Sequence, residues 1–297
     1  MNGNWMRRPE GGGRLPLRLL CGFALAFGRA PSRAIICFVA LYFMLRRKPE
    51  RRASRQFLER VLGRPATSYE VYRHILCFSL VTLDRIYLLH EGTRRFAIET
   101  VGLDEVHAVM ALNRGVLLFG AHFGSYEVMR VLSLQRPDLE FRAVIDLEQA
   151  PAMSQLLGSL NPELAATVIN ARHAGPAVAL AIKDALDQRA AVTLLADRVR
   201  PGGRTIEAQF LGARAPFPSA PWEIAAALGA PVVLCFGVYQ GGNRYHLHFE
   251  IVTEKILRER AGGPAITGWV QSFADKLADR ATNTPYNWFN FYDFWAG

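Results

Sequence analysis

The stretch RGVLLFGAHFGSYEVM (residues 114–129) decides the fold. An uninterrupted apolar run, GVLLFGA (115–121), is followed by a histidine and a short glycine-containing loop, and then a helical pattern begins. A continuous apolar run of this length is typical of a strand buried on both faces, as found in parallel sheets that helices cover. His122 therefore stands at the carboxyl end of a buried strand, and Glu127 lies in the first turn of the next helix.

Short β-rich runs and helical patterns alternate along the rest of the chain. Strands are predicted at residues 96–102, 115–121, 140–146, 166–170, 190–196, 205–212, 230–239 and 244–252. Helices are predicted within 56–91 and at 103–113, 125–135, 149–160, 175–188, 219–228 and 264–281. This order predicts an α/β fold with a mostly parallel central sheet flanked by helices. A Gly-Gly-Asn turn joins the last two strands, which predicts an antiparallel hairpin at one edge of the sheet.

The composition is that of one large globular domain in a reducing compartment. The chain has 297 residues, 51% of them hydrophobic, which is enough for a substantial core. The four cysteines are widely spread, lie in apolar surroundings and form no C-x-x-C pair, so neither a disulfide framework nor a zinc site is expected. We predict no metal and no cofactor.

The N-terminal region has the composition of a membrane-surface segment. Two apolar runs (19–27 and 34–45) are followed by a basic cluster within residues 46–55, and the whole chain carries a net charge of +9. Both runs are shorter than the roughly 20 residues that span a bilayer, so residues 1–60 are predicted to lie on an anionic membrane surface. The alternative is two amphipathic helices packed on the main domain, 61–297, with a solvated basic turn. Nucleic acid is not predicted as a partner, because the cations cluster beside apolar segments.

His122 and Glu127 are candidates for acid–base chemistry. A carboxylate that orients an imidazole fixes its tautomer and stabilises the imidazolium, which makes the histidine a general base for a hydroxyl. Gly124 and Ser125 leave space for a substrate near the backbone. The alternative is that His122 bonds a backbone group and Glu127 is a solvated residue at the helix N-terminus. The sequence contains no G-x-S-x-G, H-E-x-x-H or G-x-x-x-x-G-K-[ST] motif.

The stretch around His122 and Glu127 resembles a motif of a known family. GAHFGSYEV (120–128) is similar to the His-x4-Asp/Glu motif of the glycerolipid and lysophospholipid acyltransferase superfamily, in the form found in the late acyltransferases of lipid A biosynthesis. The similarity continues through residues 193–236 and covers roughly 90–295 in order and spacing. The aromatic ending TPYNWFNFYDFWAG (284–297) departs from the Trp-and-basic ending of the lipid A enzymes and resembles relatives linked to aryl-polyene or other glycolipid products.

This resemblance implies an activity and a location. A fatty acyl chain would pass from an acyl carrier protein or coenzyme A thioester to a hydroxyl of a lipid or glycolipid, without an acyl-enzyme, at the cytoplasmic face of the inner membrane. His122 would be the base, oriented by Glu127, and N–H groups at Gly124 and Ser125 or a nearby arginine would stabilise the oxyanion. Further substrate-binding residues implied by the resemblance are Arg172, Asp197, Arg198, Phe210 and Gly212. The alternative function is a non-catalytic lipid- or membrane-binding module.

Overall fold

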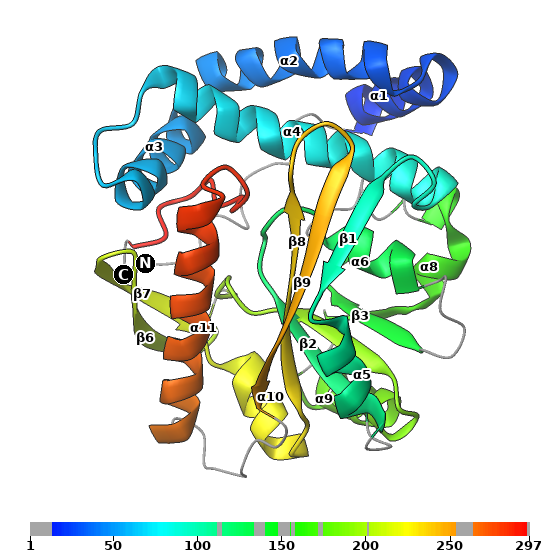
Figure 1. Ribbon diagram of the computed structural model, residues 1–297, viewed down its shortest axis with the longest axis vertical. Coiled ribbons are helices and arrows are strands. Elements are labelled where there is room, and N and C mark those ends of the chain that lie inside the picture. The colour runs from blue at the N-terminus through cyan, green and yellow to red at the C-terminus, as the bar shows by residue number, and fades with distance from the viewer. Residues whose placement is uncertain are drawn as a thin grey trace.

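The computed structural model describes residues 14–111, 115–133, 140–147, 155, 158–171, 175–200, 202–253 and 264–295. Its centre is a seven-stranded sheet in the order β1-β9-β8-β2-β5-β3-β4, in which only the β8–β9 pair is antiparallel (Figure 1). The strands are β1 (Ala97–Val101), β2 (Val116–Gly120), β3 (Phe141–Ile145), β4 (Val168–Asn170), β5 (Ala191–Leu195), β8 (Val232–Tyr239) and β9 (Arg244–Thr253). The predicted α/β class with a mostly parallel sheet is confirmed.

Helices cover both faces of this sheet. All five residues of β2 are buried, and they alternate between two cores: Val116 and Leu118 belong to one, Leu117 and Phe119 to the other. The first core lies under α5 (Leu103–Ala111), α6 (Tyr126–Ser133), α8 (Pro162–Ala166) and much of α4 (Ser68–Glu91). The second lies under α9 (Gly175–Asp187), α10 (Ala220–Leu228) and α11 (Pro264–Asn283). This arrangement explains why β2 reads as a continuous apolar run.

Two details of the sheet differ from the sequence prediction. The β8–β9 hairpin forms as predicted, but β1 pairs in parallel outside β9 and takes the edge position. The mostly exposed residues of β1 suit an edge, whereas Tyr245 and Leu247 of β9 are fully buried. The predicted strand at 205–212 is β6 (Thr205–Phe210), which pairs with β7 (Ala213–Pro218) in a separate two-stranded sheet beside α11. Most of the helix predicted at 149–160 falls outside the described residues.

Within the described residues, α4 is preceded by α1 (Arg14–Phe27), α2 (Arg29–Arg46) and α3 (Lys48–Leu62). In Figure 1, α2 runs along α4 at one side of the molecule, and it packs there through Ser32, Ile36 and Ala40, which recur every four residues. Within the described part of the chain, no helix has the length and apolar character needed to cross a membrane. The predicted boundary at residue 60 falls inside α3, and the division into two domains stays a prediction.

A well-formed N-terminus fixes the start of α4, the long helix that carries several buried polar residues. Thr67 Oγ1 accepts a hydrogen bond from the backbone N–H of Glu70 at 3.2 Å, and the Glu70 carboxylate accepts one from the backbone N–H of Thr67 at 2.8 Å. This reciprocal capping box stabilises a helix by about 1 kcal/mol. It sets the register in which His74, Asp84 and Arg85 face the rest of the protein.

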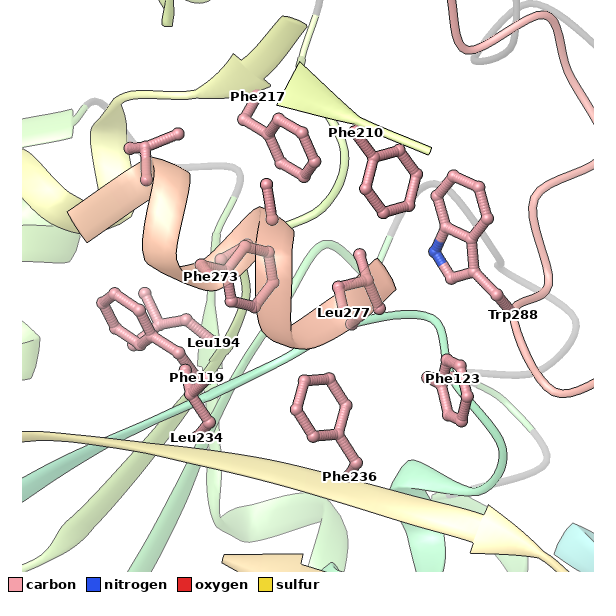
Figure 2. Packing of buried hydrophobic residues seen from close by; sticks show 14 of the residues in the cluster. Phe119, Phe123, Leu194, Phe210, Phe217, Leu234, Phe236, Phe273, Leu277 and Trp288 are labelled. Carbon is pink, nitrogen blue, oxygen red and sulfur yellow. The ribbon is translucent and has the colours of Figure 1, made fainter. Parts of the chain in front are cut away.

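An aromatic core holds the C-terminal segment against the carboxyl ends of the strands. Figure 2 shows Phe119 and Phe236 from the sheet facing Phe273 of α11, with Phe210 and Trp288 next to each other beyond them. The rings of Phe210 and Trp288 meet edge to face, with centroids 5.1 Å apart. Such pairs add about 0.5–1.5 kcal/mol to the free energy of burying their surface. The segment after α11 is therefore firmly placed beside the loops that end the strands.

Candidate active site

His122 and Asp197 meet at the carboxyl ends of two neighbouring strands. His122 follows β2, Asp197 follows β5, and the two strands are paired so that Gly120 lies opposite Leu195. His122 Nδ1 lies 2.8 Å from Asp197 Oδ1, and the backbone N–H of His122 donates to Asp197 Oδ2 at 2.9 Å. The carboxylate therefore fixes both the ring and the main chain of His122, as expected for residues at this edge of a parallel sheet.

The geometry defines the protonation state of the His122 imidazole. Because an ionised carboxylate only accepts, Nδ1 carries the proton, and Nε2 has a lone pair and no hydrogen bond to any described residue. Partial burial and the charge of Arg198 lower the pKa of His122 below its ordinary 6.5, and the Asp197 carboxylate opposes them. The side chain of His122 remains 30% exposed, whereas that of Asp197 is fully buried. A neutral, accessible imidazole with a free nitrogen is suited to accept a proton.

Asp197 is held as an anion. Burial by itself raises the pKa of a carboxyl group, but the charge and hydrogen bonds of His122 and the charge of Arg198 outweigh burial and lower the pKa of Asp197. Arg198 is fixed in turn, since its Nη2 donates to the carbonyl of Phe289 at 2.6 Å. Asp197 and Arg198, which the resemblance places at the substrate pocket, thus both adjoin His122.

The structure differs from the sequence prediction at Glu127. Its carboxylate accepts hydrogen bonds from Arg85 of α4 and from Arg130 one turn further along α6, and the carboxylate on Nδ1 of His122 is that of Asp197. Glu127 is the second residue of α6, a position from which its side chain faces α4. Burial opposes ionisation, but the two guanidinium groups outweigh it and lower the pKa of Glu127. Glu127 therefore lies in a buried ion cluster.

The loop after His122 is tied to the backbone on both sides. The N–H of Gly124 donates to the carbonyl of Asn287 at 2.8 Å, and that of Ser125 donates to the carbonyl of Gly237 at 2.7 Å. A Cβ on Gly124 would lie 1.9 Å from the Gly237 oxygen, and Gly124 has a φ of +58°, so only glycine fits. The space at Gly124 is thus filled by β8, and neither N–H is free to bind an oxyanion. The nearby arginine, Arg198, remains a candidate for that role.

A chain of hydrogen bonds runs from the N-terminal helices to Asp197. The indole N–H of Trp288 donates to Asp197 Oδ2 at 3.1 Å, and the carbonyl of Trp288 accepts from His74 Nε2 at 2.8 Å. His74 Nδ1 lies 2.8 Å from Ser54 Oγ of α3. Burial lowers the pKa of His74 to about 4, so the ring is neutral, with its proton on Nε2 and the Ser54 hydroxyl as donor to Nδ1. Trp288 thus orients the residue that orients His122.

Replacing Trp288 with phenylalanine is expected to lower kcat about tenfold with little change in KM, because a hydrogen bond to a charged acceptor contributes about 1.5–3 kcal/mol. The matched control is Trp295→Phe, which removes an indole N–H that donates to the carbonyl of Phe210 at 3.2 Å and does not reach Asp197. Steady-state kinetics of both variants measure the difference. Equal effects of the two substitutions would show that only packing of the C-terminal segment matters.

The remaining predicted residues fall in three different places. Phe210 is buried at the end of β6 in the aromatic core, where it contacts Trp288. Gly212 occupies the β6–β7 turn with a φ of +81° and is exposed. Arg172 lies outside the described residues. Among the described residues, neither Phe210 nor Gly212 makes a hydrogen bond or ring contact with His122, so their part in substrate binding stays a prediction.

Sequence reasoning missed several residues around the site. Arg85, Arg130, His74 and Trp288 come from distant parts of the chain, and only Trp288 had a signal, the unusual density of aromatic residues near the end of the sequence. Among the described residues, no group of histidine, cysteine or acidic side chains is arranged to hold a metal ion.

Comparison with known proteins places this site in a family. The family model for the bacterial lipid A biosynthesis acyltransferases matches residues 21–296, nearly the whole chain. A comparison with curated protein sequences gave no match. The matched region includes the whole sheet, the His122–Asp197 pair and the N-terminal helices from the middle of α1 onward. The chain belongs to the bacterial lipid A biosynthesis acyltransferase family, and it is an acyltransferase of the late lipid A type.

Proposed function

We propose that the protein transfers a fatty acyl chain from an acyl carrier protein or coenzyme A thioester to a hydroxyl of a lipid or glycolipid, with His122 as general base and Asp197 as its orienting carboxylate. The observation that carries this proposal is the 2.8 Å contact between His122 Nδ1 and a fully buried carboxylate, in an imidazole that is 30% exposed and whose Nε2 bonds to no described residue. Family membership supports acyl transfer to a lipid A precursor.

The reaction follows from this geometry. The acceptor hydroxyl gives its proton to Nε2 while its oxygen attacks the thioester carbonyl, and Asp197 stabilises the imidazolium that forms. A tetrahedral intermediate results, whose oxyanion requires a donor such as the Arg198 guanidinium. When the C–S bond breaks, the imidazolium returns the proton to the departing sulfur. The products are the acyl ester and the free thiol of the carrier, and no covalent acyl-enzyme is needed.

The N-terminal helices support docking on a membrane. While Ser32, Ile36 and Ala40 of α2 face α4, the opposite side of α2 and part of α1 expose large apolar side chains to solvent: Leu19, Leu25, Phe27, Ile35, Phe38, Leu41, Tyr42 and Leu45. The basic segment Arg46–Lys48 follows directly. An apolar stripe beside cations suits insertion into the boundary between lipid headgroups and acyl chains. We therefore place the protein at the cytoplasmic face of the inner membrane.

An acyl-transfer assay on the purified full-length protein tests this function. With acyl carrier protein and coenzyme A thioesters as donors, His122→Ala is expected to lower kcat/KM by at least about a thousandfold, since it removes the base. His90→Ala, at a half-exposed histidine near the end of α4, is the matched control. Mass spectrometry of lipids from cells with and without the gene names acyl chain and acceptor. Full activity of a folded His122→Ala variant would refute the assignment of the base.

The pH profile of kcat/KM is expected to reveal the lowered pKa of His122. The neutral imidazole is the active form, so activity should be lost as the pH falls through that pKa, with a midpoint below the ordinary 6.5. Arg198→Gln removes the positive charge that, together with burial, lowers this pKa and should move the midpoint upward. Rates are measured between pH 5 and 8. On the acidic side kcat/KM should fall about tenfold per pH unit, and the two profiles give both midpoints. A wild-type midpoint at or above 6.5 would contradict the proposed environment of His122.

A further inference from the structure

A basic pocket lies where α1 meets α2, apart from the residues used in the mechanism. It has a volume of about 650 Å³ and is lined by Phe27, Arg29, Ala30, Pro31, Arg33 and Arg95. Arg29 and Arg33 belong to the first turns of α2, whereas Arg95 comes from the segment between α4 and β1. Three guanidinium groups from two parts of the chain therefore converge on one concave surface.

Hydrogen bonds to Asp84 and to the β8–β9 turn fix the side chain of Arg29. Its Nε and Nη2 each lie 2.8 Å from an oxygen of Asp84, a residue with no exposed surface, which also accepts from the hydroxyl of Tyr245 at 2.9 Å. Nη2 also donates to the carbonyl of Gly242 in the β8–β9 turn. The side chain of Arg29 is nevertheless 16% exposed. A bidentate contact to a buried carboxylate fixes the guanidinium before any ligand arrives, so little side-chain entropy is lost on binding.

The other two arginines leave positive charge at the pocket. Arg33 donates to two neutral acceptors, the Tyr239 hydroxyl at 3.0 Å and the Gly242 carbonyl at 3.1 Å. Arg95 pairs with Glu91 at the surface, where both side chains are partly exposed and the attraction is screened by water. The three guanidinium groups are thus balanced by two carboxylates, those of Asp84 and Glu91, which leaves an excess of positive charge.

The N-terminus of α2 adds to this potential. Gly28 precedes the helix and offers no side chain to cap it, and the Ser32 hydroxyl donates to the Gly28 carbonyl instead. Arg29 and Ala30, whose N–H groups belong to the first turn, line the pocket. The positive end of an 18-residue helix therefore opens onto the same space as the arginines.

The surroundings of the pocket indicate the origin of its ligand. Phe27, at the pocket wall, is 66% exposed, and other large apolar side chains of α1 and α2, among them Leu25 and Phe38, are exposed as well. Cations recessed beside exposed apolar side chains match a phosphate at the level of the headgroups with acyl chains alongside.

We propose that this pocket binds the phosphate of a membrane lipid, through Arg29, Arg33, Arg95 and the N-terminus of α2. The proposal rests on the membrane docking of α1 and α2 put forward above. It adds a specific polar contact to that docking, so that the protein recognises phosphorylated lipids at this position and not just negative surface charge.

Calorimetric titration of the full-length protein with a soluble short-chain phosphatidic acid tests the proposal, because it removes the membrane from the measurement. We expect saturable binding of one lipid per chain, weakened at least about tenfold in Arg33→Gln and in Arg95→Gln by the loss of charge-assisted hydrogen bonds. Arg214→Gln, at an exposed arginine of β7, makes the same change in net charge and should bind as the wild type does. Thermal melts confirm that the variants are folded.

Other outcomes separate the sources of phosphate and the two proposals. Inorganic phosphate that binds as tightly as the short-chain lipid would show a site for free phosphate and overturn the lipid assignment. Equal losses of lipid affinity in Arg33→Gln and Arg214→Gln, or binding that does not saturate, would show that non-specific electrostatic attraction explains the binding and would overturn the proposal. Weaker binding of acyl carrier protein by Arg33→Gln with lipid binding unchanged would assign the pocket to the carrier. Lipid binding without any acyl transfer would refute the proposed function and leave the pocket standing.

Discussion

Asp197→Asn is expected to lower kcat by about three orders of magnitude while the protein stays folded, since the loss of an orienting carboxylate has a comparable effect in histidine-based catalysis. Asparagine keeps the shape of the buried side chain but has no charge to stabilise the imidazolium. Its amide can also donate to Nδ1, which would place the ring proton on Nε2 and block the base. Single-turnover acyl transfer and far-ultraviolet circular dichroism measure activity and folding separately.

A suitable control for this substitution is Asp146→Asn, which changes an acidic residue at the end of a neighbouring strand. Asp146 follows β3 and pairs with Arg200 at the surface. Its replacement should leave kcat within about threefold of the wild type, as is common for surface positions. If Asp197→Asn retained wild-type kcat, the contact between Asp197 and His122 would have no catalytic importance.

Glu127→Ala is expected to destabilise the fold by about 3–5 kcal/mol, because it removes the carboxylate that pairs with the buried guanidinium of Arg130. Arg130 has no exposed surface, and its Nη1 lies 3.2 Å and 3.3 Å from the two oxygens of Glu127. Its Nη2 is committed to the carbonyl of Leu164 at 2.9 Å. Chemical denaturation monitored by tryptophan fluorescence measures the loss, with Glu207→Ala at an exposed position of β6 as control.

The same experiment separates two roles for Glu127. Since the pKa of Glu127 is lowered on folding, its carboxylate contributes stability above the ordinary 4.5 that is lost as the pH falls. The Glu127→Ala variant should therefore show a weaker dependence of its unfolding free energy on pH in this range. A variant with normal stability and a large loss of kcat would instead support a direct role of Glu127 beside His122.

Much of the fold could be predicted because its signals are local. The apolar run of β2, the helical pattern that starts α6 and the short turn between β8 and β9 each depend on neighbouring residues. The position of β1 outside β9 depends on pairing between residues 147 positions apart, which no local pattern specifies, as in the contact of Glu99 with His246 on adjacent strands. The burial that suits β9 to an interior position of the sheet, such as that of Tyr245, can be seen only in the folded protein.

The partner of His122 shows the same limit within the site. Glu127 is five positions away in the sequence, so spacing favoured it, whereas Asp197 is 75 positions away. Only the adjacency of β2 and β5 in the sheet brings Asp197 to the imidazole. The sequence did place both residues at strand ends, and family resemblance identified the Asp197 loop. It could not show that Arg85 reaches Glu127 from a helix that begins far upstream.

The hydrogen bonds from Ser54 through His74 and Trp288 to Asp197 have a consequence for substrate choice. They connect α3 and α4 to the imidazole, and α2 packs on α4, so we expect Nε2 to hold one position relative to the exposed face of α2. On a bilayer docked against that face, only hydroxyl groups at a matching depth come within reach of Nε2. Under the proposed docking, we therefore expect the depth of the acceptor's hydroxyl in the membrane to decide whether the protein acylates it.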